Sequence, residues 1–234
     1  MKIYKLIVSF LITLSIFSQT AEEFYATAIT KANTRDNKGA IENYDKAIQL
    51  KPDFYNAYNN RGLIKHDLED LEGAKKDFDK AIELNPKYAV ALFNRGNVLA
   101  ELEQYSKALL DFDLSISIDS SNLNTFANRG AVKRNLKDYK GSLKDFEKAL
   151  QLNPKNIDVY FSMALVKSDM QDYQGAIDDF TKIIDFEPNE FNAYYNRGIM
   201  YLKINKKENA CNDFKKAFEL GNEDANEKLS KHCK

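Results

Sequence analysis

Four asparagines with a fixed spacing offer the clearest binding chemistry in this sequence. Each opens an Asn-Arg-Gly triplet, and the four residues are Asn60, Asn94, Asn128 and Asn196. Successive members are 34, 34 and 68 residues apart. An asparagine amide carries both N–H donors and a carbonyl acceptor, so a line of amides can bind a peptide backbone whatever its side chains are. The other interpretation is that these amides are merely solvated.

Side chains suited to catalysis or metal binding are few. The two histidines, His66 and His232, share no repeat pattern with a nucleophile, and two cysteines are too few for the usual zinc cluster. Eight of the nine glycines fall at two repeat positions, so none belongs to a phosphate-binding loop. We therefore expect no enzyme activity, no catalytic residue, no metal site, no cofactor and no small-molecule substrate.

The charge balance argues against nucleic acid as a partner. Lys and Arg number 34 and Asp and Glu number 35, which gives a formal net charge of −1. A protein that binds nucleic acid needs a basic face that replaces the counterions of the phosphates. We therefore expect no nucleic-acid partner.

The 34-residue spacing extends to other residue types and defines six units between residues 21 and 224. All four prolines keep it, namely Pro52, Pro86, Pro154 and Pro188. So does a series of aromatic residues, namely Tyr44, Phe78, Phe112, Phe146, Phe180 and Phe214. A short repeated unit cannot bury its apolar face alone, and neighbouring units must stack to form a continuous core.

Each unit has the pattern of two helices. Within residues 55–88, apolar side chains recur at a spacing near 3.6 residues on either side of a polar turn, and Pro86 ends the second helix. Small residues at Gly62, Ala74 and Ala81 allow the two helix backbones to approach closely. Phe78 is expected to fill the space between the stacked units.

These positions resemble the tetratricopeptide repeat family, which has an aromatic residue at unit position 4, Gly or Ala at 8, Ala at 20 and 27, an aromatic at 24 and Pro at 32. The resemblance implies an all-α fold, an α-solenoid that forms a right-handed superhelix of six 34-residue helix–turn–helix repeats plus a C-terminal capping helix. The expected segments are a signal peptide at 1–20, repeats at 21–54, 55–88, 89–122, 123–156, 157–190 and 191–224, and the capping helix at 225–234.

The resemblance also implies a concave groove lined by the first helix of each repeat, in which an extended peptide or a protein partner binds. The four asparagines would lie in it at unit position 6. Position 5 adds aromatic side chains, namely Tyr25, Phe93, Phe161 and Tyr195. The expected function is a scaffold for protein–protein interaction. The alternative is a structural subunit of a cell-envelope complex that uses its convex or end surfaces.

The arginine of the triplet predicts a structural ion pair. Arg61, Arg95, Arg129 and Arg197 stand at position 7, and an aspartate stands at position 23 of the same units. We expect each Arg–Asp pair to join the first helix of a unit to the second, extended in some units by a lysine at position 11. The fifth unit keeps Asp179 but has Met163 in place of the arginine.

The two cysteines predict a disulfide. Cys211 and Cys233 lie at equal distances along the chain from Asn222, where a turn is expected, and an antiparallel helix hairpin would bring them level. A disulfide would persist in an exported protein. The alternatives are two unpaired thiols or a metal site that includes His232.

The first 20 residues have the order of a secretory signal peptide. Lys2 and Lys5 precede an apolar run from Leu6 to Phe17, and small polar residues follow. The run is too short to cross a bilayer comfortably, so no stable membrane span is expected after cleavage. We expect an exported protein, periplasmic or secreted, or one held at the cell envelope. The alternatives are a buried N-terminal helix and a signal retained as an anchor.

Cleavage of this segment should leave a mature N-terminus between Ser18 and Ala21. N-terminal sequencing of the protein from its native cells measures this directly. An intact Met1 on protein recovered from a cytosolic fraction would contradict export.

Overall fold

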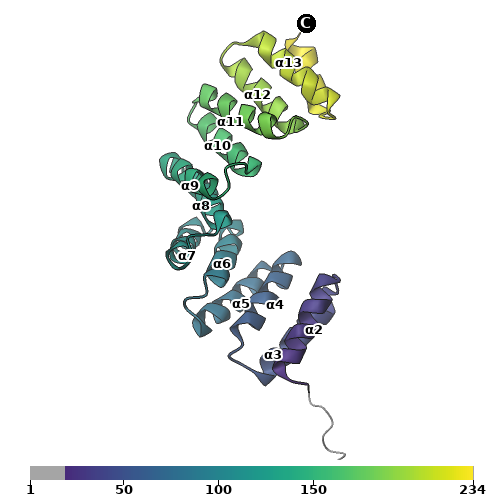
Figure 1. Ribbon diagram of the computed structural model, residues 1–234, viewed down its shortest axis with the longest axis vertical. Helices are drawn as coiled ribbons and strands as arrows, with labels where there is room; N and C mark the ends of the chain where they lie inside the picture. The colour runs from purple at the N-terminus through teal and green to yellow at the C-terminus, as the bar shows by residue number, and fades with distance from the viewer. Residues whose placement is uncertain (1–18, 234) are drawn as a thin grey trace, which may run out of the picture. The chain divides into compact units, whose positions relative to one another are not determined.

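The computed structural model describes residues 19–233 and contains thirteen helices and no strand within that range (Figure 1). The all-α prediction is therefore confirmed. The segment expected to be a signal peptide falls almost wholly on residues 1–18, which lie outside the described residues. No helix in the described range is both long enough and apolar enough to cross a membrane.

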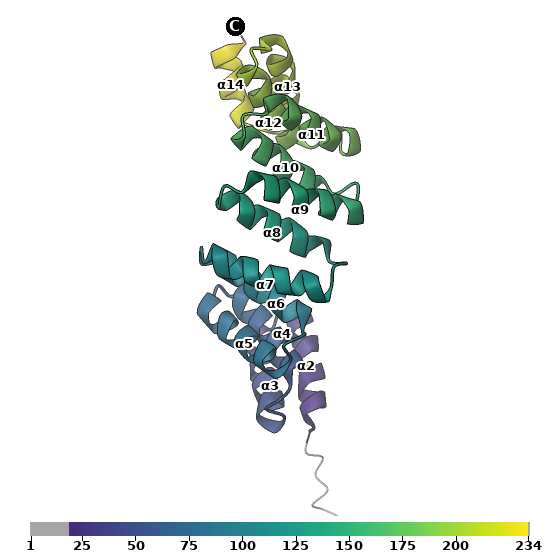
Figure 2. The same cartoon turned by 90° about the vertical axis from the view of Figure 1, so that its left-hand side faces the viewer.

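The chain divides into two compact units, residues 1–98 and 99–234, and the division falls inside one helix. Unit 1 contains α2 (Ala21–Asn33), α3 (Asn37–Leu50), α4 (Tyr55–Asp67), α5 (Leu71–Leu84) and most of α6 (Ala89–Glu101). Unit 2 contains the end of α6, then α7 (Tyr105–Ile118), α8 (Leu123–Asn135), α9 (Tyr139–Leu152), α10 (Ile157–Asp169), α11 (Tyr173–Phe186), α12 (Phe191–Lys203), α13 (Lys207–Glu219) and α14 (Asp224–His232). Within each unit, helices adjacent in the chain pack against each other (Figure 2).

An aspartate begins the second helix of most repeats. The carboxylate of Asp70 accepts a hydrogen bond of 2.9 Å from the backbone N–H of Gly73, and Asp36, Asp138 and Asp172 make the same cap. A Cβ atom at Gly73 would lie 2.0 Å from the Asp70 carboxylate. Glycine recurs at this position because the capping side chain occupies the space of a Cβ.

The turn between the two helices of a repeat contains a non-glycine residue in the left-handed region. This residue has φ between 57° and 63° in all six repeats, as Arg35, Glu69, Glu103, Lys137, Gln171 and Asn205. The following backbone N–H donates to a carbonyl of the first helix, as from Asp70 to Lys65 at 2.9 Å. This hydrogen bond at the helix end stabilises the turn. The left-handed conformation is sterically unfavourable for a residue with a side chain, and glycine would adopt it more easily.

The core of each repeat is an aromatic ring pressed against the first helix. Phe78, Phe146 and Phe214 are almost completely buried, and a Cβ added at the facing Gly62, Gly130 or Gly198 would lie 2.7–2.9 Å from the ring. The same repeat position is buried in the other repeats, as Tyr44, Phe112 and Phe180. The predicted close approach of the two helices is therefore confirmed.

The predicted Arg–Asp pair is confirmed and takes the form of a two-pronged contact. In Arg129 the Nε atom donates to Oδ2 of Asp145 at 2.9 Å and an Nη atom donates to Oδ1 at 2.6 Å. Arg61 with Asp77 and Arg197 with Asp213 repeat the arrangement. A lysine at position 11 joins two of these pairs: the Lys133 ammonium lies 2.8 Å from Asp145, and Lys65 lies equally close to Asp77.

The same arginine also reaches the preceding repeat, which the sequence pattern did not predict. The other Nη of Arg129 donates to Asp113 of α7 at 2.6 Å, and Arg95 reaches Asp79 of α5 at 2.8 Å. Arg197 makes the corresponding contact with the Thr181 hydroxyl at 3.0 Å. One arginine thus joins three helices: the two of its own repeat and the second of the repeat before it.

The fifth repeat lacks this arrangement because Met163 replaces the arginine. Asp179 stays buried, and the Lys167 ammonium lies 2.6 Å from its Oδ2 without hydrogen-bond geometry. Burial raises the pKa of Asp179, and Lys167 opposes that shift only in part. Since the folded state favours the protonated form, ionisation of Asp179 lowers stability as pH rises from the ordinary carboxyl pKa through the raised one.

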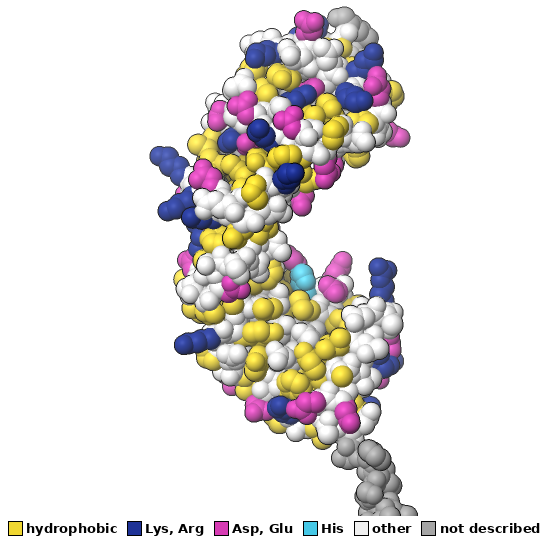
Figure 3. Space-filling model, in the orientation of Figure 1, with side chains coloured by type: hydrophobic (Ala, Val, Ile, Leu, Met, Phe, Trp, Pro, Cys, Tyr) yellow, Lys and Arg dark blue, Asp and Glu magenta, His cyan; other side chains and the backbone are white. Residues whose placement is uncertain are grey.

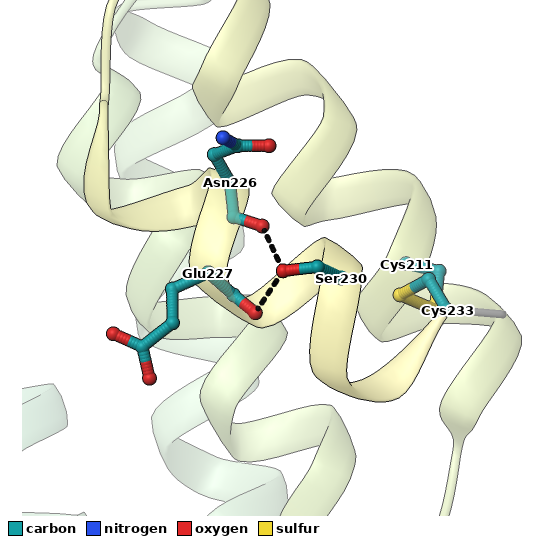
Figure 4. Close-up of a disulfide and its surroundings, with 5 residues drawn as sticks. All are labelled: Cys211, Asn226, Glu227, Ser230 and Cys233. Atoms are coloured by element: carbon teal, nitrogen blue, oxygen red, sulfur yellow. Dashed lines mark hydrogen bonds between the residues drawn. A yellow bond between two sulfur atoms is a disulfide. The ribbon is translucent and has the colours of Figure 1, made fainter.

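The predicted disulfide is present between Cys211 of α13 and Cys233 at the end of α14, with Cα atoms 5.6 Å apart (Figure 4). Ala225 and Leu229 of α14 pack on the cluster around Phe214. The Ser230 hydroxyl donates to backbone carbonyls of its own helix, and the disulfide joins the end of α14 to α13 in addition to the connecting turn.

Substitution of a buried aspartate should cost far more stability where an arginine depends on it. Asp145→Asn removes the charge that faces Arg129 and Lys133, and we expect a loss of about 3 kcal/mol in the free energy of unfolding. Asp179→Asn is the matched control, because its carboxylate is already disfavoured at neutral pH, and it should change stability by less than about 1 kcal/mol. Urea denaturation at pH 7 measures both, and equal losses would contradict the difference in pairing.

Reduction of the disulfide should loosen α14 selectively. The chain-entropy estimate for a loop of this length is about 3 kcal/mol, and α14 packs against few neighbours. Hydrogen exchange with and without a phosphine reductant should show loss of protection in residues 224–232 and little change in α8 and α9. Unchanged protection of α14 in the reduced protein would show that packing alone holds it.

Candidate functional site

Unit 1 contains a hollow of about 380 Å³. Eight residues line it, namely Ile29, Ala32, Asn33, Tyr44, Asn60, Leu63, Ile64 and Asp67. The buried side chains of Tyr44 and Ile64 form its floor, while Asn33 and Asp67 are exposed at its rim. Figure 3 shows hydrophobic side chains at the surface of unit 1 in the region of α2 to α5.

Two first helices position this lining. Ile29, Ala32 and Asn33 recur three or four residues apart on one face of α2, and Asn60, Leu63, Ile64 and Asp67 do the same on α4. Tyr44 reaches the hollow from α3, where it holds the repeat's aromatic position. The lining therefore consists of first-helix side chains over a ring of the core, as the groove prediction requires for these two repeats.

A chain of side-chain hydrogen bonds crosses unit 1 beside the hollow. The Asn94 amide donates to the carbonyl of Asn59 at 2.9 Å, Asn59 donates to Asn60 at 3.0 Å, and Asn60 donates to the Tyr25 hydroxyl at 2.9 Å. The chain links α6, α4 and α2. It fixes the orientation of the two middle amides, because Asn59 and Asn60 each accept a hydrogen bond on one side and donate one on the other.

This chain changes what the predicted asparagines can offer a partner. Asn94 and Asn59 are buried, so their amides serve the protein itself. The Asn60 amide interacts with the hydroxyls of both Tyr25 and Tyr44. Each tyrosine accepts a hydrogen bond from it and therefore keeps its own proton to donate. Burial raises the pKa of Tyr25 and of Tyr44, so both hydroxyls stay protonated near neutral pH.

The other two predicted asparagines, Asn128 and Asn196, lie in unit 2 and differ in their surroundings. The Asn196 amide donates to the Asn192 carbonyl of its own helix at 2.8 Å, and Asn128 is half-buried on α8. Their contribution to binding stays a prediction. The structure brings together Tyr25, Asn60 and Asn94 in unit 1.

The predicted aromatic residues are half-buried and packed on the core. The Tyr25 ring lies 4.7 Å from that of Phe54, Phe161 lies 5.4 Å from Phe180, and Tyr195 packs on Phe214 at 5.9 Å between centroids. Phe93 is also half-buried. Each aromatic side chain that would face a partner is thus supported from below, which limits its loss of freedom on binding.

Three residues of the site are not among the groove residues chosen from the sequence, although their repeat positions were expected to face the groove. Asn59 interrupts the aromatic series at position 5, and only its contacts with Asn94 and Asn60 reveal its role. Asn33 and Asp67 are the last residues of α2 and α4. Both stand at unit position 13, which the family resemblance places among the groove-facing positions, and both line the hollow.

A second hollow of similar volume lies near the C-terminal end of unit 2. Its lining is Leu202, Asn205, Lys207, Lys231 and His232. The two lysines and Asn205 are exposed, and Leu202 is the one apolar side chain among these five. The hollow of unit 1 has an apolar floor and fixed polar groups, so it is the better candidate for binding.

Comparison with protein families identifies the class of this chain. Models of the tetratricopeptide repeat match residues 36–69, 55–88, 78–109, 124–156, 157–190 and 191–223. The chain belongs to the tetratricopeptide repeat family. Proteins of this family bind protein or peptide partners and are generally non-catalytic scaffolds. Among curated proteins, none matches the sequence significantly.

Solved structures of the same fold support this assignment. PilF of Pseudomonas aeruginosa is 17% identical with a TM-score of 0.75, and a tetratricopeptide repeat protein of Parabacteroides merdae is 22% identical with a TM-score of 0.71. Both comparisons cover 90% of this chain and 97% of the other. YrrB, described as having an unusual peptide-binding site, is 24% identical with a TM-score of 0.67, over 80% of this chain and 97% of its own.

Proposed function

We propose that the protein is an exported tetratricopeptide repeat scaffold that binds a peptide or protein partner along its first helices. The observation that carries the proposal is the hollow of unit 1, which combines an apolar floor with amide groups of fixed orientation. The signal-like order of Lys2, Lys5 and the apolar run after them supports export. A peptide-binding site is also described for YrrB, a protein of the same fold, and this is consistent with the proposal.

The hollow suits one side chain of an extended partner. Burial of a leucine- or phenylalanine-sized group contributes about 1.5–3 kcal/mol, and a hydrogen bond donated by the Tyr44 hydroxyl in the lining adds about 0.5–1.5 kcal/mol. Because Tyr44 and Ile64 are already packed in the core, binding does not have to order the floor.

A second candidate function is a structural subunit that docks through an outer helix face, and α7 favours it. Leu110 is 69% exposed, and Leu114 and Ile118 follow on the same face at 45% and 38%. The positions of Leu110 and Leu114 are polar or charged in the other five repeats, for example Lys144 and Lys148. An exposed aliphatic stripe of this kind is typical of a contact surface.

The family models add weight to this difference. The matched segments end at residue 109 and resume at residue 124, so the part of α7 that carries the stripe is unmatched. In this stripe of Leu110, Leu114 and Ile118, the two leucines stand where other repeats have polar or charged side chains that favour contact with water. The stripe is therefore an observation that groove binding does not explain.

Paired variants distinguish the two functions. Asn60→Ala with Leu63→Asn alters the hollow and leaves the Phe78 core intact, while Leu110→Lys with Leu114→Lys restores the charges typical of other repeats. Crosslinking and mass spectrometry from the native envelope, with the intact protein as bait, should show partner crosslinks that the hollow variant loses and the stripe variant keeps.

Circular dichroism controls for the fold of each variant, because only equal helix content makes the comparison valid. Loss of the crosslinks in the stripe variant alone would favour the structural-subunit function instead. Full retention in the hollow variant would contradict binding in unit 1.

A further inference from the structure

We propose that the hollow of unit 1 selects a basic peptide: it takes an apolar side chain on its floor and a Lys or Arg side chain, within two positions, at the Asp67 carboxylate. This inference rests on the proposed function and adds the chemical class of the partner. The observations that carry it are the charges around the hollow and the place of Asp67 in its helix.

Asp67 is the one charged side chain in the lining of the hollow. Within the described part of the chain, no ion pair or hydrogen bond engages its carboxylate. Three neighbouring cations on α2 and α4 have carboxylate partners of their own. Lys31 pairs with Asp36 at 2.8 Å, Lys65 lies 2.8 Å from Asp77, and Arg61 holds the same aspartate.

Stability does not account for an aspartate at this position. Asp67 is the last residue of α4, where the partial negative charge of the helix end disfavours a carboxylate. Lys65 in the same turn carries the positive charge that a helix C-terminus favours. An aspartate at this position lowers the stability of the helix. A role in binding a cation at the rim of the hollow explains its presence.

Asn33 of the neighbouring repeat places a second hydrogen-bond acceptor at the rim of the hollow. It ends α2 as Asp67 ends α4, and both line the hollow at its exposed rim. The Asn33 carbonyl is an acceptor that a Lys ammonium or an Arg guanidinium can share with the Asp67 carboxylate. A carboxylate of the partner would instead meet repulsion from Asp67 at this rim.

The apolar part of the hollow sets the second requirement. Ile29, Ala32 and Leu63 form walls above the ring of Tyr44, and none of them offers a hydrogen bond to a polar side chain. In an extended peptide, side chains two residues apart point the same way and lie about 6–7 Å apart. A residue pair of apolar and basic type at this spacing can therefore fill the floor and reach the rim together.

The test is selection of phage-displayed random dodecapeptides on the purified protein, with competition by the Asn60→Ala, Leu63→Asn variant to identify peptides that need the hollow. We expect these peptides to carry Lys or Arg within two positions of an apolar residue. Synthetic copies should bind the Asp67→Asn variant about tenfold more weakly, which corresponds to the loss of one charge-assisted hydrogen bond. Selection on Asp67→Lys should enrich Asp or Glu in place of the basic residue.

Asp53→Asn is the matched control, because it removes one negative charge from an exposed turn of unit 1 outside the hollow. It should bind the same peptides with unchanged affinity. A loss equal to that of Asp67→Asn would mean that net charge alone attracts the peptides, and this would overturn the inference.

The two levels of the proposal fail differently. If hollow-dependent peptides are enriched without a basic residue, or if Asp67→Asn binds them equally well, the basic-peptide inference is wrong and peptide binding stands. If no enriched peptide depends on the hollow, peptide binding by unit 1 is wrong as well.

Discussion

The close contact between an aromatic ring and a glycine is the constraint on which the repeats depend. The Phe78 ring fills the space that a Cβ of Gly62 would need, so the two helices of the repeat approach as far as their backbones allow. Burial of such a ring contributes on the order of 2–3 kcal/mol in each repeat. In the first repeat Tyr44 holds the ring position, and the same side chain forms the floor of the hollow. The candidate site is thus built directly on the core.

The three residues of the Asn-Arg-Gly triplet lie on one turn of a helix and have three different structural roles. The glycine admits the ring, the arginine joins three helices, and the asparagine lies at the face where first helices meet. Buried ion pairs add little net stability over apolar packing, because their desolvation offsets most of the attraction. The value of Arg129 between Asp145 and Asp113 is therefore specificity: it fixes how one repeat follows the next. The fifth repeat, with Met163 at the arginine position, still forms its two helices. Its buried Asp179 carboxyl group then has a raised pKa, because burial disfavours the charged form.

Features that recur every 34 residues could be predicted from the sequence, because repetition makes each position visible several times. The helix pairs, the buried ring and the Arg–Asp pair follow from this spacing. The disulfide between Cys211 and Cys233 was predicted separately, from their equal distances to the turn at Asn222. Features that depend on a single departure could not. Asn59 looked like a gap in an aromatic series, yet it connects Asn94 to Asn60 across three helices. The left-handed turn was also hidden, because hydrogen bonds to the preceding helix stabilise it without glycine.

The hollow of unit 1 sets selectivity more than affinity. One apolar side chain and one or two hydrogen bonds supply about 2–6 kcal/mol, while association costs about 4–15 kcal/mol in lost translational and rotational freedom. A partner must therefore make further contacts along the first helices of unit 1, where the half-buried Tyr25 ring, packed on Phe54, offers a rigid surface. The Asp67 carboxylate then discriminates among apolar segments. An acidic residue placed at the rim weakens binding by more than a basic residue strengthens it. Weak contacts along neighbouring first helices and a strict charge requirement at one of them are compatible properties of a scaffold that binds extended chains.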